Sequence, residues 1–154
     1  MTAARPHKVM AVASGGGHWV QLCRLVPAFD QGEVFFASVD AAPAAEMRDV
    51  VYYDIPDATR RDRLAFVPLV IRIGRILLKE RPDTVVTTGA APGLVALVMA
   101  KLLLRSRTVW IDSLANVERM STAGRLARRV SDVWLTQWEH LSTPEGPDYW
   151  GAVL

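Results

Sequence analysis

Two glycine-rich segments of this sequence have the residue types that bind polar or anionic ligands. The first is Ser14-Gly15-Gly16-Gly17-His18, directly after the apolar run 9–13. Its glycines permit a sharp turn and the close approach of a ligand to the backbone. The N-terminus of a following helix would offer free N–H groups and partial positive charge to an anionic or polyhydroxylated ligand. We place His18 in the first turn of that helix, facing the ligand; the alternative is a tight turn with an incidental histidine.

The second segment, Thr87-Thr88-Gly89-Ala90-Ala91-Pro92-Gly93, also stands between an apolar run and an apolar helix. Proline is suited to the first turn of a helix, because its missing N–H would have no partner there. The small residues leave the backbone open to a ligand. The alternative is a compact turn between a strand and a helix. The residues assigned to a ligand site are Thr88, Gly89, Ala90, Pro92 and Gly93.

Two further polar clusters follow apolar runs. Asp112-Ser113 could place a carboxylate in the same site or could cap the next segment, since both residue types are good helix N-caps. Gln137-Trp138-Glu139 could contact a sugar or a partner protein, or could hold a tryptophan that covers the sheet. His18, Asp112 and Glu139 are the candidates for a general base.

Several kinds of chemistry are excluded by motif. No Gly-Lys-Ser/Thr completes a Walker loop, the GxGxxG dinucleotide spacing is absent, and no GxSxG nucleophile elbow occurs. The three histidines lack HxxH or HExxH spacing, so we expect no metal site and no cofactor. Cys23 is the only cysteine, which excludes an internal disulfide and indicates a reducing compartment.

Alternating apolar and amphipathic segments predict an α/β fold. Strands are expected over 9–13, 33–39, 50–55, 84–88, 107–111 and 132–136, and helices over 18–29, 64–80, 93–104 and 123–130, with a loop and short helix over 40–49. Several strands are apolar throughout, which is typical of a parallel sheet covered on both faces. The composition, 51% hydrophobic and 22% charged, is that of a folded protein. We therefore predict a single Rossmann-like domain over 1–154 with one doubly wound parallel sheet.

This topology brings the polar clusters together. In such a sheet, ligands bind beyond the carboxyl ends of the strands. Ser14–His18, Gly89–Gly93, Asp112-Ser113 and Gln137–His140 each follow one of the predicted strands. The sequence thus predicts one site, built from all four clusters at the same edge of the sheet.

The predicted helix between Leu64 and Arg81 carries both apolar and basic residues. Arg72, Arg75 and Lys79 recur at i, i+3 and i+7 and therefore line one stripe. Such a helix is either a surface helix with a solvated basic face or one that lies on an anionic membrane surface. The net charge of +2 and the local nature of the basic clusters exclude a broad nucleic-acid footprint. The apolar stretch Gly93–Leu104 is shorter than the ~20 residues of a membrane span, so we expect a buried helix there.

Four motifs in series resemble a known family. They are Ala13–His18, Thr87–Gly93, Trp110–Val117 and Asp132–Glu139. Together they resemble the oligosaccharide-biosynthesis subunit that partners the catalytic chain in the UDP-GlcNAc transferase of N-glycan assembly. The accessory subunits of bacterial capsule and exopolysaccharide glycosyltransferases are similar. The chain departs from the family pattern at Asp112, where Glu is common, and at Asn116, where Arg is common.

The resemblance implies the N-terminal, acceptor-side half of a GT-B glycosyltransferase, with an active site between two polypeptides. It implies a polyprenyl-diphosphate-linked acceptor, a catalytic partner subunit with the UDP-sugar domain, and a peripheral place at the cytoplasmic face of the plasma membrane. His18 matches a histidine to which catalysis or acceptor binding is ascribed in the similar N-acetylglucosamine transferase of peptidoglycan synthesis. The glycine-rich segments and Asp112-Ser113 would border the acceptor, Gln137–Glu139 the partner, and Arg72, Arg75 and Lys79 the membrane.

Two other functions stay open. The chain could be a recruiting module whose partner carries all the chemistry, or a stand-alone α/β domain that binds a small ligand. The residues after the last predicted strand are too few for a second Rossmann domain, which favours a two-component enzyme.

Overall fold

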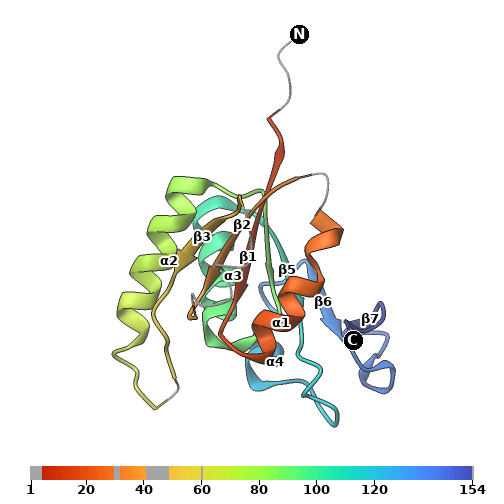
Figure 1. Ribbon diagram of the computed structural model, residues 1–154. Coiled ribbons are helices and arrows are strands. Elements are labelled where there is room, and N and C mark those ends of the chain that lie inside the picture. The colour runs from red at the N-terminus through yellow and green to blue at the C-terminus, as the bar shows by residue number, and fades with distance from the viewer. Residues whose placement is uncertain (1–4, 30–31, 41–48, 60, 154) are drawn as a thin grey trace.

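The computed structural model describes residues 5–29, 32–40, 49–59 and 61–153 (Figure 1). Within these residues, parallel strands form a seven-stranded sheet in the order β3-β2-β1-β4-β5-β6-β7. The strands are β1 (His7–Ala13), β2 (Gly32–Ser38), β3 (Val51–Asp54), β4 (Thr84–Thr87), β5 (Arg107–Ile111), β6 (Val133–Thr136) and β7 (Asp148–Tyr149). The predicted fold class, α/β with a single doubly wound parallel sheet, is confirmed.

The connections between strands contain helices and short 3₁₀ turns. They are α1 (Gly17–Arg24), η1 (Val26–Phe29), α2 (Phe66–Glu80), α3 (Ala90–Leu104), α4 (Thr122–Ala127) and η3 (Glu139–Leu141). Each predicted strand and helix is present, with boundaries shifted by a few residues. β7 is not predicted by the sequence, because a strand of two residues carries no periodic pattern. The loop and short helix predicted over 40–49 lie almost wholly outside the described residues.

Two helix boundaries differ from the prediction for local backbone reasons. The helix predicted over 18–29 ends at Arg24, and Pro27 lies in η1. A proline ring inside a helix removes a hydrogen bond and collides with the preceding turn, so the α-helix stops before it. α3 begins three residues earlier than predicted, because Gly89 (φ 126°) and Ala90 (φ 65°) complete the turn out of β4 at once.

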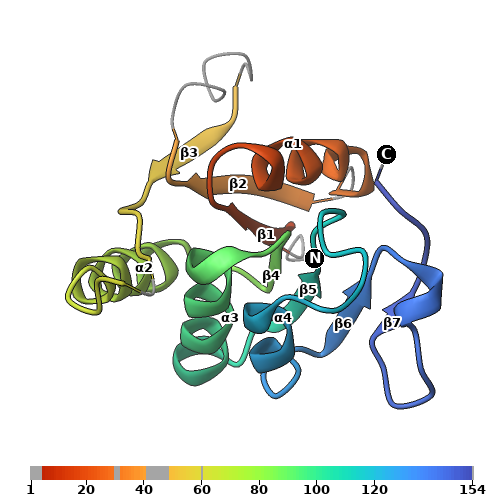
Figure 2. The same cartoon turned by 90° about the horizontal axis from the view of Figure 1, so that it is seen from below.

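The helices are divided unequally between the two faces of the sheet. α2, α3 and α4 cover one face, and α1 lies on the other (Figure 2). Chain direction explains the division. The connections β3–β4, β4–β5 and β5–β6 all advance the same way along the sheet, and right-handed crossovers that advance the same way lie on one face. The β1–β2 connection runs the opposite way and places α1 opposite.

The main hydrophobic core lies between the sheet and the layer of α2, α3 and α4. Met10, Phe35 and Trp110 are buried there against α2 and α3. A smaller core lies under α1, where Trp19 packs edge-on against Phe36. The two cores fix the strands that carry the predicted site.

The face of the sheet that carries α1 is only partly covered. A groove of about 760 Å³ lies beside α1, and its walls are η1 and the C-terminal residues 150–153. We call it the sheet groove. Its apolar floor consists of Val9, Val86, Val109, Ile111, Val133 and Leu135. The sequence predicts a sheet covered on both faces, whereas the described residues supply no helix over β4, β5 and β6 on this side.

α2 is held to the sheet by an ion pair at its C-terminal end. Glu80 accepts hydrogen bonds from the Lys8 ammonium group at 2.6 Å and from the Tyr53 hydroxyl group. The hydrogen bond from Lys8, followed by that from Tyr53, holds the pKa of Glu80 below its ordinary value. These contacts join α2 to both β1 and β3.

Candidate functional site

The four predicted polar clusters do meet at one edge of the sheet. They follow β1, β4, β5 and β6, which are neighbours and all parallel. Between β1 and β4 the strand order reverses, because β1 continues to β2 on one side while β4 lies on the other. In doubly wound sheets a crevice forms at such a point and binds ligands. The two glycine-rich segments border this crevice.

His18 joins the two glycine-rich segments. It is the second residue of α1 and is half-buried, and its Nδ1 lies 2.8 Å from the carbonyl oxygen of Thr88. The Thr88 hydroxyl group in turn donates to the carbonyl oxygen of His18 at 2.6 Å. The segment after β1 and the segment after β4, 70 residues apart in sequence, are thus bound to each other.

The N-termini of α1 and α3 lie beside this contact. Their N-caps are Gly16 (φ 64°) and Gly89 (φ 126°), and neither makes a side-chain cap hydrogen bond. Helix N-termini without a side-chain cap can bind anions or hydroxyl groups through their backbone N–H groups. Ser14, Gly15 and Gly17 are partly or fully exposed on this edge, whereas Pro92 and Gly93 are buried in α3.

The carboxylate of Asp112 is buried and hydrogen-bonded within its own loop. It accepts hydrogen bonds from the Trp110 indole (3.0 Å), the Asn116 carboxamide (3.0 Å), and both the backbone N–H (2.8 Å) and the hydroxyl group of Ser121 (2.6 Å). Asp112 is 1% exposed. A carboxylate with four donors is stable as an anion in such a place. These contacts organise the segment between β5 and α4; a role toward an acceptor stays a prediction.

A buried network of amides lies behind the site. The Gln21 carboxamide donates to Ser113 Oγ (3.1 Å) and to the Gly17 carbonyl (3.2 Å), and its oxygen accepts from Leu114 N–H (3.0 Å). Gln137 donates to the Gln21 side-chain oxygen (2.8 Å) and to the carbonyl of Asp112 (2.8 Å). This network fixes the end of β6 and the β5 loop relative to α1.

Gln21 is a residue of the site that sequence reasoning misses. It stands three residues after His18, so it lies near the same side of α1. That spacing is the only sequence signal for it. Its partner Gln137 is 116 residues away, and periodicity alone does not reveal such a pair.

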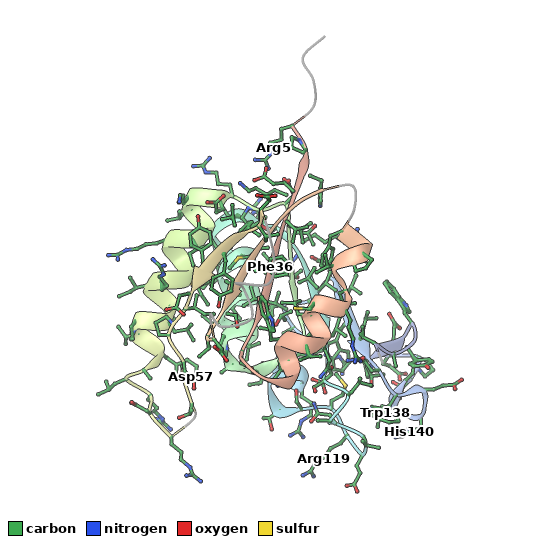
Figure 3. All side chains as sticks on the ribbon, in the orientation of Figure 1. Arg5, Phe36, Asp57, Arg119, Trp138 and His140 are labelled. Atoms are coloured by element: carbon green, nitrogen blue, oxygen red, sulfur yellow. The ribbon has the colours of Figure 1, made fainter. Side chains whose placement is uncertain are left out.

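The three residues predicted for a partner interface occupy different environments. Gln137 is buried and lines the sheet groove, where its oxygen accepts a hydrogen bond from the backbone N–H of Val153 at 2.8 Å. Trp138 is half-buried, and its indole N–H donates to the Leu114 carbonyl at 2.9 Å. Glu139 is exposed. Trp138 lies next to His140 at the side of the molecule that carries β6 and β7 (Figure 3).

The basic residues of α2 are not equivalent. The Arg72 guanidinium donates to the Asp54 carbonyl at 3.0 Å, and the Lys79 ammonium donates to the Tyr53 hydroxyl at 2.9 Å. Both cations also lie over the Tyr53 ring. Arg75 is exposed between Ile71 and Leu78, which are about half exposed themselves. The outward stripe of α2 is therefore apolar with Arg75 in its middle.

Two searches of the described residues gave negative findings. None of the described His, Cys, Asp and Glu side chains form a group of three or more that could hold a metal ion. Among the same residues, no helix has the length and apolar character needed to cross a membrane.

Sequence comparison relates this chain to one protein family. The model of the family described as "Oligosaccharide biosynthesis protein Alg14 like" matches residues 63–153. The UDP-N-acetylglucosamine transferase subunit ALG14 of Candida albicans is 28% identical over 90% of this chain and 74% of its own length. The protein of the same name from Eremothecium gossypii is 27% identical over 97% of this chain and 80% of its own length.

Solved structures share the fold of this chain. Acinetobacter baumannii MurG matches with a TM-score of 0.69 and 14% identity, over 95% of this chain and 44% of MurG. UDP-N-acetylglucosamine 2-epimerase from Rickettsia bellii matches with a TM-score of 0.66 and 18% identity, over 88% of this chain and 40% of the epimerase. The chain thus spans less than half the length of these structures and has the Rossmann-like fold found in GT-B glycosyltransferases. Since the family match covers more than half of its residues, the chain belongs to the Alg14-like family of oligosaccharide biosynthesis proteins.

Proposed function

We propose that this chain is the acceptor-side subunit of a two-component, inverting GT-B glycosyltransferase that uses a UDP-sugar. Its relatives are described as UDP-N-acetylglucosamine transferase subunits, which supports the donor class and the existence of a second chain. The observation that carries the proposal is the contact of His18 with Thr88, which joins both glycine-rich segments at the β1–β4 crevice. The acceptor is a polyprenyl-diphosphate-linked sugar.

His18 is the proposed general base. It would take the proton of the acceptor hydroxyl group as the bond to the donor sugar forms. The carboxylates weighed with it are placed less favourably, since Asp112 is buried with four donors and Glu139 lies beyond β6. In this proposal Ser14, Gly15–Gly17 and Thr88–Ala90 surround the acceptor, whose diphosphate is stabilised by the N-termini of α1 and α3.

The catalytic subunit with the UDP-sugar domain packs on the sheet groove. A parallel sheet normally has both faces covered, and here the apolar floor over β4, β5 and β6 lacks a helix within the described residues. Trp150 lines this groove and is 70% exposed, which is unusual for a tryptophan without a partner. Gln137 extends the surface from the groove toward Trp138 and Glu139.

The membrane contact of the proposed subunit is peripheral and uses α2. Leu64, Val67, Ile71 and Leu78 expose apolar surface, and Arg75 supplies charge attraction to anionic lipid. Arg72 and Lys79 flank this stripe from the side of β3. The proposed location is the cytoplasmic face of the plasma membrane.

The proposal is tested by purifying the tagged chain from native membranes and identifying co-eluting proteins by mass spectrometry. A stoichiometric partner with a nucleotide-binding domain supports it, and transfer is then measured with UDP-GlcNAc and a polyprenyl-diphosphate-linked sugar. His18→Ala should lower kcat of the assembled pair about a hundredfold or more without preventing assembly. His140→Ala is the matched control, because His140 is exposed outside the crevice. A soluble monomer without a partner would contradict the proposal.

The recruiting module is separated by the same variants. Full activity of His18→Ala, together with loss of assembly on substitution in the sheet groove, would mean that the partner carries all the chemistry. Binding of a UDP-sugar by the isolated chain would instead favour a stand-alone small-ligand domain.

A further inference from the structure

The imidazole of His18 is held by the turn between β4 and α3. Its Nδ1 lies 2.8 Å from the Thr88 carbonyl, and the Thr88 hydroxyl donates to the His18 carbonyl at 2.6 Å. Thr88 is fully buried, so water does not compete for either contact. One residue of β4–α3 thus fixes both the ring and the backbone of His18.

The contact with Thr88 determines which ring nitrogen carries the proton. A carbonyl oxygen can only accept a hydrogen bond, so Nδ1 must be the protonated nitrogen. In a neutral imidazole the other nitrogen, Nε2, then has a lone pair. Neutral histidine in water prefers the opposite tautomer, with the proton on Nε2. The Thr88 carbonyl therefore selects the form in which Nε2 can accept a proton.

Gly89 provides the space that the ring occupies. A Cβ atom on Gly89 would lie 2.8 Å from His18 Cε1 and 3.0 Å from His18 Nδ1, which is closer than such atoms approach. The φ angle of Gly89, 126°, is also one that residues with side chains rarely adopt. Both observations require glycine at this position, and both concern the histidine ring.

The next residues support this turn from behind. The Thr87 hydroxyl accepts a hydrogen bond from Gly89 N–H at 3.2 Å. A Cβ atom on Gly93 would lie 2.0 Å from that hydroxyl oxygen, so Gly93 makes room for Thr87. The spacing of the motif is thereby explained by a chain of contacts that leads from Gly93 to His18.

We infer that Thr88 and Gly89 are positioning residues that act through His18, holding its Nδ1–H tautomer and leaving Nε2 to face the acceptor. This assigns them a role different from direct contact with the acceptor. The catalytic part of the inference rests on the proposed function, whereas the tautomer is a property of this chain alone. The two can therefore fail separately.

The tautomer is measured on the isolated chain by two-bond ¹H–¹⁵N NMR correlation of the histidine rings at a pH where they are neutral. His18→Gln identifies the signals of His18 among those of the three histidines. The expected pattern is a protonated Nδ1 and an unprotonated Nε2. A protonated Nε2, or an averaged mixture of the two forms, would overturn the inference whether or not the chain takes part in glycosyl transfer.

Gly89→Ala tests the positioning role in the same chain. The added methyl group should displace the ring and abolish the preference for Nδ1–H. Gly151→Ala is the matched control: Gly151 also has a positive φ of 108°, and its Cβ would meet nothing within 4 Å. In Gly151→Ala the His18 signals should stay as in the wild type. An unchanged tautomer in folded Gly89→Ala would sink the positioning role, and if that variant does not fold, the wild-type spectrum still decides the tautomer.

Kinetics of the assembled pair separate positioning from acceptor contact. If Gly89 acts through His18, Gly89→Ala lowers kcat about a hundredfold while KM for the acceptor changes about twofold or less. A raised KM with unchanged kcat would mean that Gly89 contacts the acceptor itself, and would overturn the inference.

Discussion

The hydrogen-bond partners of single side chains decide what the polar residues of this site can do. Asp112 and His18 both stand at the carboxyl edge of the sheet. The carboxylate of Asp112 receives four hydrogen bonds from its own loop, whereas His18 uses one nitrogen toward Thr88 and has a second on the same ring. Two residues of similar appearance in the sequence therefore have different amounts of hydrogen-bonding capacity left for a ligand.

At this scale we predict that Asp112→Asn destabilises the fold. The new carboxamide would turn an N–H₂ group toward donors that now meet an acceptor, and charge-assisted hydrogen bonds would be lost in a buried place. The expected loss is about 2 to 4 kcal/mol of unfolding free energy, measured by urea titration. Asp148→Asn, at an exposed aspartate, is the control and should change stability little. Equal stability of both variants would mean that the Asp112 network contributes nothing.

At the scale of elements, the sequence predicts the order of strands and helices and the edge at which the polar clusters meet. These follow from local periodicity and from the geometry of parallel strands. The partners of individual side chains do not follow. Gln21 meets Gln137 across 116 residues, and two of the three cations on α2 fold back onto β3, because tertiary packing and not spacing selects such contacts. The uncovered half of one sheet face is missed for the same reason.

The outward stripe of α2 gives a prediction about membranes. Arg75→Glu reverses the charge in the middle of an exposed apolar stripe and should weaken binding to vesicles that contain anionic lipid about tenfold or more. Binding is measured by cosedimentation. The control is Arg125→Glu, the same change at an exposed arginine on α4. Equal loss in the two variants would show a general effect of net charge and would remove α2 as the contact surface.

At the scale of the whole molecule, the chain has one closed layer of helices and one incomplete layer. α2, α3 and α4 complete one side of the sheet, while α1 and the C-terminal residues 150–153 leave the sheet groove between them (Figure 2). These C-terminal residues are held in place by Val153, whose N–H meets Gln137 and whose carbonyl meets Arg24. A wall of the groove is thus linked to the amide network behind the site.

We predict that Trp150→Ala weakens assembly with the catalytic subunit without destabilising the isolated chain. The side chain is 70% exposed here, so its truncation costs little in folding, but a tryptophan buried at an interface contributes about 2 kcal/mol or more to binding. The affinity of the purified pair should fall about thirtyfold. Leu126→Ala, at an exposed apolar residue of α4, should leave it unchanged. Wild-type affinity of Trp150→Ala would place the interface elsewhere.

The incomplete layer also bears on how much of this protein a cell can keep. A floor of valine, isoleucine and leucine side chains open to water resembles the surface of an unfolded chain, to which chaperones and proteases bind. A copy synthesised in excess of its partner would be removed, while a paired copy would have this surface covered. The abundance of one subunit would then follow that of the other with no need for matched synthesis of the two.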